Sequence, residues 1–168
     1  MARALTVLTL LLTLTAPAMA ADWGGIEPGV TTIEQVKDRY GSPSTEKQVK
    51  VEGYDTQEWV YQGDNAPGGL VRMIVEFGLL TPAGYKPSIV RILKLEPQPN
   101  IFGRGTVVQG WGVPDGVGTQ DGLVTAFYKE GLFVVFDKDG QMALTMIFSI
   151  PQPDTPPPVA PSAPAPKK

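Results

Sequence analysis

The chain has 168 residues, of which 42% are hydrophobic, and a formal net charge of -3. This is enough apolar material for one folded domain, or for two small ones that share a core. The sequence has no cysteine and no histidine, which excludes disulfides, cysteine lipidation, Cys/His metal sites and histidine-based catalytic triads. With 14 Lys and Arg against 17 Asp and Glu, the charge balance does not favour nucleic acid or an anionic membrane as a partner.

Residues 1–20 have the pattern of a secretory signal peptide. A positive charge at Arg3 precedes an apolar and hydroxyl run from Leu5 to Thr15, and the small-residue triplet Ala18-Met19-Ala20 follows. The apolar run is shorter than the roughly 20 residues that span a bilayer. We therefore expect cleavage near Ala20, a location in the periplasm or outside the cell, and no membrane span or lipid anchor afterwards.

A short helix is predicted between Pro28 and Pro43. The helix face is formed by apolar side chains at helical spacing: Ile33, Val36 and Tyr40. Two capping boxes fit its start, one pairing Thr31 with Glu34 and the other Thr32 with Gln35. Gly41 and Pro43 then predict where the helix ends.

Most of the remaining chain has the composition of β-strands, rich in Val, Ile, Trp and Tyr and separated by turn residues. The expected strands are Gln48–Glu52, Gln57–Gln62, Leu70–Phe77, Ile89–Leu95, Leu123–Tyr128, Leu132–Phe136 and Ala143–Phe148. The connectors Lys129–Gly131 and Asp137–Gly140 have the chemistry of hairpin turns.

A spacing of 71 residues relates the two halves: Trp111 follows Tyr40, and Val107 follows Val36, at this distance. The pattern predicts an α+β fold of two tandem repeats, each a short helix packed on an antiparallel β-meander, which together form one curved sheet. The predicted divisions are the signal peptide 1–20, a first repeat 21–98, a second repeat 99–150 and a disordered Pro-rich tail 151–168.

The segments Gly29–Val36 and Tyr40–Pro43 resemble the opening of the SmpA/OmlA (BamE-like) family, and Tyr128–Gly140 resembles the hairpin that follows. In tandem, the arrangement is similar to the β-lactamase-inhibitor-protein-like fold over roughly residues 24–150. The resemblance implies a non-catalytic, protein-binding role in the bacterial envelope, linked to outer-membrane assembly.

Carboxylates are the remaining source of catalytic chemistry, since a glycosidase needs two of them across a cleft. The candidates are Asp55, Glu58, Glu76 and Asp121. They fall at turns or at alternate strand positions, where a solvated face predicts them equally well. We therefore expect no enzyme activity, no catalytic residues and no cofactor.

The segment Asp137–Gly140 is rich in carboxylates, as calcium-binding loops are. An EF-hand has Gly at its sixth position and Glu at its twelfth, whereas here Gly140 is fourth and Phe148 is twelfth. A plain hairpin turn is the better interpretation, and no metal site is expected.

The aromatic residues of one predicted strand indicate a binding surface. Trp59 and Tyr61 share one strand face, while Val60 takes the other. Because Trp, Tyr and Arg often anchor interfaces, we expect Trp59 and Tyr61, with Arg72 and Arg91 beside them, to bind another envelope or secreted protein through an exposed sheet face.

An alternative hypothesis is a periplasmic carrier that holds a small apolar ligand. Its lid would be a predicted long loop bearing Leu79, Leu80 and Tyr85, flanked by Pro82 and Pro87. Partner identity, oligomeric state and the role of the tail do not follow from the sequence.

Overall fold

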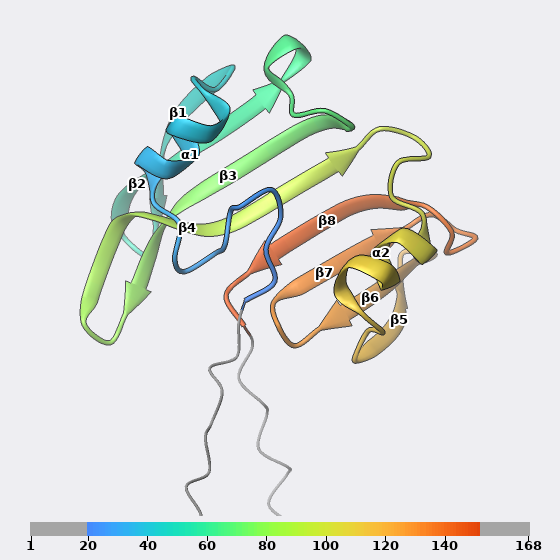
Figure 1. Ribbon diagram of the computed structural model, residues 1–168. Coiled ribbons are helices and arrows are strands. Elements are labelled where there is room, and N and C mark those ends of the chain that lie inside the picture. Colours follow the sequence, from blue (N-terminus) through green and yellow to red (C-terminus); the bar gives the residue numbers. More distant parts are fainter. Residues whose placement is uncertain (1–19, 152–168) are drawn as a thin grey trace, which may run out of the picture.

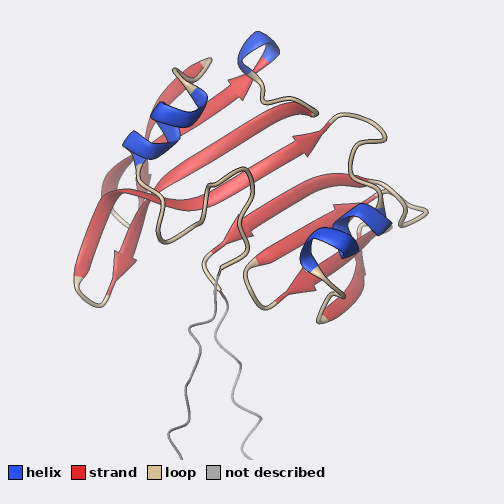
Figure 2. Ribbon diagram, viewed as in Figure 1, coloured by secondary structure: helices blue, strands red, loops and turns tan. Residues whose placement is uncertain are grey.

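A computed structural model describes residues 20–151, most of which form β-strands (Figures 1 and 2). The helices are α1 (Ile33–Tyr40) and α2 (Arg104–Trp111), with a short 3-10 turn η1 (Gly63–Asn65). The strands are β1 (Thr45–Val51), β2 (Tyr54–Gln62), β3 (Leu70–Thr81), β4 (Gly84–Pro97), β5 (Gly116–Gln120), β6 (Leu123–Tyr128), β7 (Leu132–Phe136) and β8 (Ala143–Ser149).

The strands form one antiparallel sheet in the order β1-β2-β3-β4-β8-β7-β6-β5. The centre of the sheet is the pairing of β4 with β8, which runs from Ile92 opposite Ser149 to Leu95 opposite Met146. Strands β1 and β5 are therefore the two edges. Both helices lie over the same face of the sheet (Figure 2), called here the helix face; the opposite side is the open face.

The predicted α+β class, with two tandem helix-on-meander repeats, is wrong. The chain instead forms a mainly β structure built on one continuous eight-stranded sheet. Each helix has only eight residues and buries one side chain fully, Val36 in α1 and Val107 in α2. Two such short helices cannot form a layer of their own, whereas hydrogen bonding between β4 and β8 joins all the strands.

The same observation overturns the resemblance to the SmpA/OmlA (BamE-like) family and to the β-lactamase-inhibitor-protein-like fold. That family has a small α/β fold, whereas this one is an extended antiparallel sheet. The segments that suggested the family are caps and turns, such as Gly41 with a φ of 73° at the end of α1. Caps and turns of this kind end helices and hairpins in many folds.

The predicted first helix is confirmed as α1, and its start uses the second of the two capping boxes. The Thr32 hydroxyl accepts from the Gln35 backbone N–H, and the Gln35 side chain accepts from the Thr32 N–H. Thr31 has another role, because its hydroxyl accepts a 2.9 Å hydrogen bond from the backbone N–H of Glu27.

The segment expected to be a loop lid is part of the sheet. Leu79 and Leu80 lie in β3, and Tyr85 lies opposite Leu80 in β4. The sequence is misleading here because Pro87, which indicated a loop, falls within β4. The pairing of β3 with β4 shifts register between Phe77 and Leu79, and irregular positions of this kind tolerate proline in strands.

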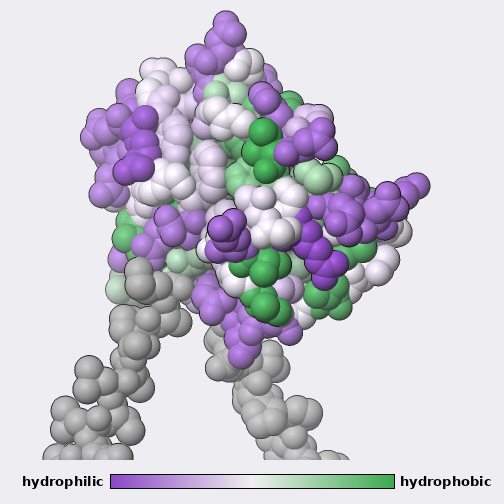
Figure 3. Space-filling view, turned by 45° about the vertical axis from the view of Figure 1, so that its right-hand side comes forward, coloured by the Kyte–Doolittle hydropathy of each residue, from purple (hydrophilic) through white to green (hydrophobic). Residues whose placement is uncertain are grey.

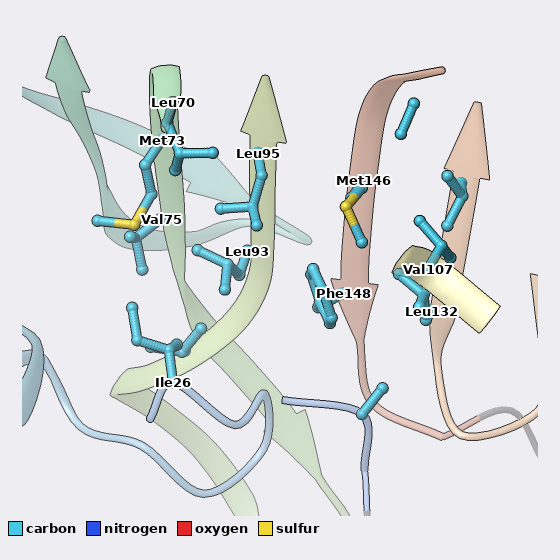
Figure 4. Packing of buried hydrophobic residues seen from close by; sticks show 14 of the residues in the cluster. Ile26, Leu70, Met73, Val75, Leu93, Leu95, Val107, Leu132, Met146 and Phe148 are labelled. Carbon is cyan, nitrogen blue, oxygen red and sulfur yellow. The ribbon is translucent and has the colours of Figure 1, made fainter. Parts of the chain in front are cut away.

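The core lies between the sheet and the helices (Figure 4). It takes alternate residues from the central strands, including Met73, Val75, Leu93, Leu95, Met146 and Phe148, all fully buried. Ile26 enters this core from the segment before α1 and is also fully buried. The core therefore spans both halves of the sheet.

Among residues 20–151, no helix has the length and apolar character needed to cross a membrane. The predicted signal peptide and the Pro-rich tail lie outside the described residues, apart from Ala20 and Pro151.

Candidate functional site: the open face of the sheet

The open face carries one row of residues that crosses all eight strands. Successive cross-strand pairs connect Thr45, Val60, Ile74, Lys94, Ile147, Phe133, Phe127 and Gly116. Because strand residues alternate between the two faces, these side chains point away from the core residues that precede and follow them. We call this set the cross-sheet row.

Five members of the cross-sheet row are apolar: Val60, Ile74, Ile147, Phe133 and Phe127. Val60 is buried by its neighbours, while Ile74, Ile147 and Phe133 are partly exposed. Phe127, next to the Gly116 position at the end of the row, is 38% exposed. Apolar side chains in such a line, partly open to solvent, are typical of a surface that a partner covers.

A row of four charges runs alongside the apolar side chains. The ammonium group of Lys47 on β1 lies 2.8 Å from the carboxylate of Glu58 on β2, and Glu58 lies opposite Glu76 on β3. The guanidinium group of Arg91 on β4 lies 2.5 Å from the Glu76 carboxylate. Arg91 is the extra residue of a β-bulge, because Glu76 pairs with Ile92 while Phe77 pairs with Val90. The bulge explains how Arg91 reaches the same face as Glu76.

A second charged group lies on the other side of the cross-sheet row. Arg72 donates two hydrogen bonds to Glu96, at 3.0 and 2.7 Å, and Lys94 lies 3.4 Å from the same carboxylate. The hydrogen bonds from Arg72 lower the pKa of Glu96, and the Glu96 carboxylate in turn raises the pKa of Arg72. Apart from Lys94, which belongs to the cross-sheet row, the open face is thus apolar in the middle and carries charges of both signs on its flanks.

The structure separates the four residues predicted to bind a partner. Arg72 and Arg91 reach the open face, whereas Trp59 and Tyr61 lie on the helix face and are 4% and 0% exposed. The Trp59 ring packs edge-on against Phe77, with ring centroids 5.1 Å apart. The expectation that these two rings are displayed on the surface is therefore wrong, because the face that they share is the one covered by the core.

Tyr61 also has a polar role in the core. Its hydroxyl donates a 3.1 Å hydrogen bond to the carbonyl oxygen of Gly41, the residue that ends α1. Burial raises the pKa of Tyr61 to about 12. Tyr128 makes the same type of bond to Gly112 at the end of α2, at 3.3 Å.

Sequence reasoning missed the apolar members of the open face. Their signal was present, because Ile74 alternates with the core residues Met73 and Val75. Alternation predicts two faces but does not say which one the helices cover, and aromatic content pointed to the wrong one.

A shallow groove of about 380 Å³ lies at one end of the open face. It is lined by the β1–β2 turn, the β3–β4 hairpin and the end of β8, with Val51, Leu80, Tyr85, Arg91, Ile92 and Ile150 among its residues. The Nε atom of Arg91 is buried there and has no hydrogen-bond partner.

The carboxylates considered for catalysis do not converge on a cleft. Asp55 pairs with Lys50 at 2.6 Å on the surface, Glu58 and Glu76 are held by the cations described above, and Asp121 belongs to the β5–β6 turn. Within residues 20–151, no group of three or more Asp and Glu could hold a metal ion.

The segment Asp137–Gly140 is a hairpin turn, as predicted. The Gly140 N–H donates to the Asp137 carbonyl at 3.0 Å, and the Asp137 carboxylate accepts from the backbone N–H of Gln141 at 2.8 Å. The carboxylate is thus engaged within the turn itself.

Comparisons with known proteins add one structural likeness. No family model and no curated protein matches the chain. The fold is similar to the crystal structure of a DUF4309 family protein (YjgB) from Bacillus subtilis subsp. subtilis str. 168, with 13% sequence identity and a TM-score of 0.48 over 76% of this chain and 83% of that one.

Proposed function

We propose that this chain is a non-catalytic, exported protein that binds another envelope or secreted protein through its open face. The observation that carries the proposal is the cross-sheet row. It has five apolar side chains between Val60 on β2 and Phe127 on β6, with Lys94 on β4 among them, while both helices lie on the other side. Binding of a partner that removes these apolar side chains from water lowers the free energy.

The residues of the open face indicate what kind of surface its partner has. An interface usually has an apolar centre and a polar rim, and here the centre contains Ile74, Ile147 and Phe133, with Arg72 and Arg91 on the two flanks. Both arginines are already paired with carboxylates, so a partner need not supply a strong net charge. We expect a protein surface with an apolar centre and charges of both signs around it.

Export is part of the proposal and is supported by the signal-peptide pattern of residues 1–20. Without cysteine, the mature chain depends on its apolar core for stability in an oxidising compartment. The fully buried residues of that core extend from Tyr61 to Phe148 across the sheet.

The proposal is tested by affinity capture from envelope extract with the mature chain, comparing surface variants. Phe127→Lys and Ile74→Lys place a charge in the cross-sheet row. Val30→Lys is the matched control, because Val30 is 60% exposed and lies outside that row, near Gln35 and Arg39 of α1. A specific protein that is retained by Val30→Lys and reduced at least tenfold in both open-face variants supports the proposal. A partner that all variants retain contradicts it, provided that circular dichroism shows every variant folded.

A second candidate, the carrier of a small apolar ligand, is favoured by the groove beside Leu80 and Tyr85. These two residues were expected in the lid and instead line the wall of the groove. Native mass spectrometry of the purified chain tests this function: a bound small molecule that Leu80→Asp removes would favour the carrier, and an unmodified mass for the wild-type chain would exclude it.

A further inference from the structure

The two edges of the sheet differ in how they are protected. Strand β1 carries charges at Glu46, Lys47 and Lys50, and charged residues on an edge discourage pairing with another chain. Strand β5, with the sequence Gly-Val-Gly-Thr-Gln, carries no charge at all. Among the described residues it has a neighbouring strand, β6, on one side only.

The surroundings of β5 are open, and apolar side chains lie on both of its faces, with Arg104 beside Val117 on the helix face. Val117 within the strand is 57% exposed, and Val113 just before it is 81% exposed. On the open face, a Cβ atom at Gly116 would meet no other atom within 4 Å, and Phe127 lies directly beside it on β6. Figure 3, which brings the β5 side of the molecule forward, shows apolar residues at the surface between hydrophilic ones.

The turn that follows β5 determines which of its backbone groups bond to β6 and which point away from it. Asp121 and Gly122 have φ angles of 52° and 76°, as a two-residue hairpin turn of type I′ requires, and they place Gln120 opposite Leu123. In such a hairpin Gln120 bonds to β6, and every second residue back along the strand does the same. The N–H and C=O groups of Val117 and Thr119 therefore point outward, away from β6.

We propose that β5 accepts an extended segment of a partner protein as a ninth strand of the sheet. In β-strand addition, main-chain hydrogen bonds supply much of the affinity and alternate side-chain positions supply specificity. Here Val117 offers an apolar contact on the helix face, and the bare backbone at Gly116 leaves space next to Phe127 on the open face.

Charge decides between a second copy of this chain and a different protein. Carboxylates flank β5 at both ends, Asp115 before it and Asp121 after it. Antiparallel pairing of two copies about Gly118 would bring Asp115 of one copy opposite Asp121 of the other, twice, and like charges in opposite positions are unfavourable.

The same flanking carboxylates favour a segment with a basic residue at each end. Asp115 accepts a 2.9 Å hydrogen bond from the backbone N–H of Lys129 and lies 3.8 Å from its ammonium group, so Asp121 carries the larger share of the attraction. The occupant that fits is an extended segment with a Lys or Arg, five uncharged strand-forming residues and a second Lys or Arg. This site shares Gly116 and Phe127 with the cross-sheet row, but it depends on the outward backbone groups of β5, so either proposal can fail without the other.

The experiment uses the mature chain and a synthetic peptide, acetyl-Lys-Val-Thr-Val-Thr-Val-Lys-amide, with a control peptide in which Glu replaces both Lys. We expect the Lys peptide to bind, to protect the Val117 and Thr119 amides from hydrogen exchange, and to bind at least tenfold more tightly than the Glu peptide. Asp121→Asn should remove most of this preference.

Proline variants test the strand itself. Val117→Pro removes an outward-pointing N–H and should weaken binding at least tenfold, whereas Gln48→Pro, at the equivalent outward position of β1, should leave it unchanged. The proposal is overturned if the Lys peptide does not bind, if Val117→Pro binds it equally well, or if sedimentation shows a dimer that Val117→Pro converts to a monomer, which would identify a second copy as the occupant.

Discussion

Glu58 and Glu76 lie directly opposite each other on β2 and β3, and each carboxylate is held by a cation on its far side. Two carboxylates in opposite positions repel each other, so this part of the open face depends on Lys47 and Arg91. The four charges cross β1 to β4 in the order positive, negative, negative, positive.

Arg91→Gln is expected to destabilise the fold by about 1–2 kcal/mol, because it leaves Glu76 uncompensated beside Glu58. Adding Glu76→Gln should recover most of the loss, since the double variant has no excess charge at this position. Urea unfolding measures both free energies. Lys50→Gln is the control: its pair with Asp55 is exposed and should change stability by less than about 0.5 kcal/mol. Equal losses in Arg91→Gln and in the double variant would argue against the charge explanation.

Local patterns predicted local structure well. Helix α1 and seven of the eight strands coincide with predicted segments, and Val107 and Trp111 lie in α2, as the 71-residue spacing suggested. Strand β5 was missed because two of its five residues are glycine, which weakens strand propensity. The fold class was wrong because α1 and α2 have only eight residues and one fully buried side chain each, so the sheet makes up most of the structure. A single sheet was expected, but no local pattern records that β4 and β8 are the strands that join its two halves.

The candidate site was harder to predict than the fold. Trp59 and Tyr61 were predicted to bind a partner because of their residue type, but their position on the helix face makes them core residues. Ile74 and Phe133 form the open face, yet in the sequence they cannot be distinguished from core aliphatic and aromatic residues. Which face of an alternating strand remains open depends on where the helices pack.

The segment before α1 connects the two halves of the molecule on the helix face. The Ala21 N–H donates to the Glu130 carbonyl at 2.8 Å, and the Gly24 carbonyl accepts from Tyr40 in α1 at 2.8 Å. Ile26 follows two residues after Gly24 and is fully buried. We expect Ile26→Ala to cost about 3 kcal/mol of unfolding free energy through the cavity that it leaves.

Chemical denaturation of the mature chain measures the effect of Ile26→Ala, and Val30→Ala, at an exposed position a few residues later, is the control with an expected change below about 0.5 kcal/mol. If Ile26→Ala were as stable as the control, the segment would not contribute to the core as described.

Combined replacement of Trp59 and Tyr61 by Ala should unfold the chain rather than remove a binding surface selectively. Each buried ring is expected to contribute about 3–5 kcal/mol, and the sum approaches the whole stability of a typical domain, about 5–15 kcal/mol. Circular dichroism and proteolysis of the double variant test this. A folded double variant that loses only its partner would instead restore these residues to the binding surface.

Alkaline pH should destabilise the fold through Tyr61. Burial raises its pKa from 10.0 to about 12, so its contribution to stability is fully present below pH 10 and is lost as the pH rises toward 12, where the unfolded chain ionises first. Tyr61→Phe should be less stable by about 1 kcal/mol at neutral pH because the hydrogen bond to Gly41 is lost, but its stability should fall less steeply above pH 10. Parallel curves for the two proteins in this range would contradict the assignment.

Acid should act through Glu96, in the opposite direction. The hydrogen bonds from Arg72 hold the pKa of Glu96 below its ordinary value of 4.5. The stability from this pair is therefore present above pH 4.5 and is lost as the pH falls through the lower pKa of the folded state, because the unfolded chain takes up its proton first. Arg72→Gln removes the cause of the shift, so the stability difference between wild type and variant should be largest near neutral pH and should shrink below pH 4.5. A difference that stays constant from pH 7 to pH 3 would show that Arg72 stabilises the sheet by packing alone.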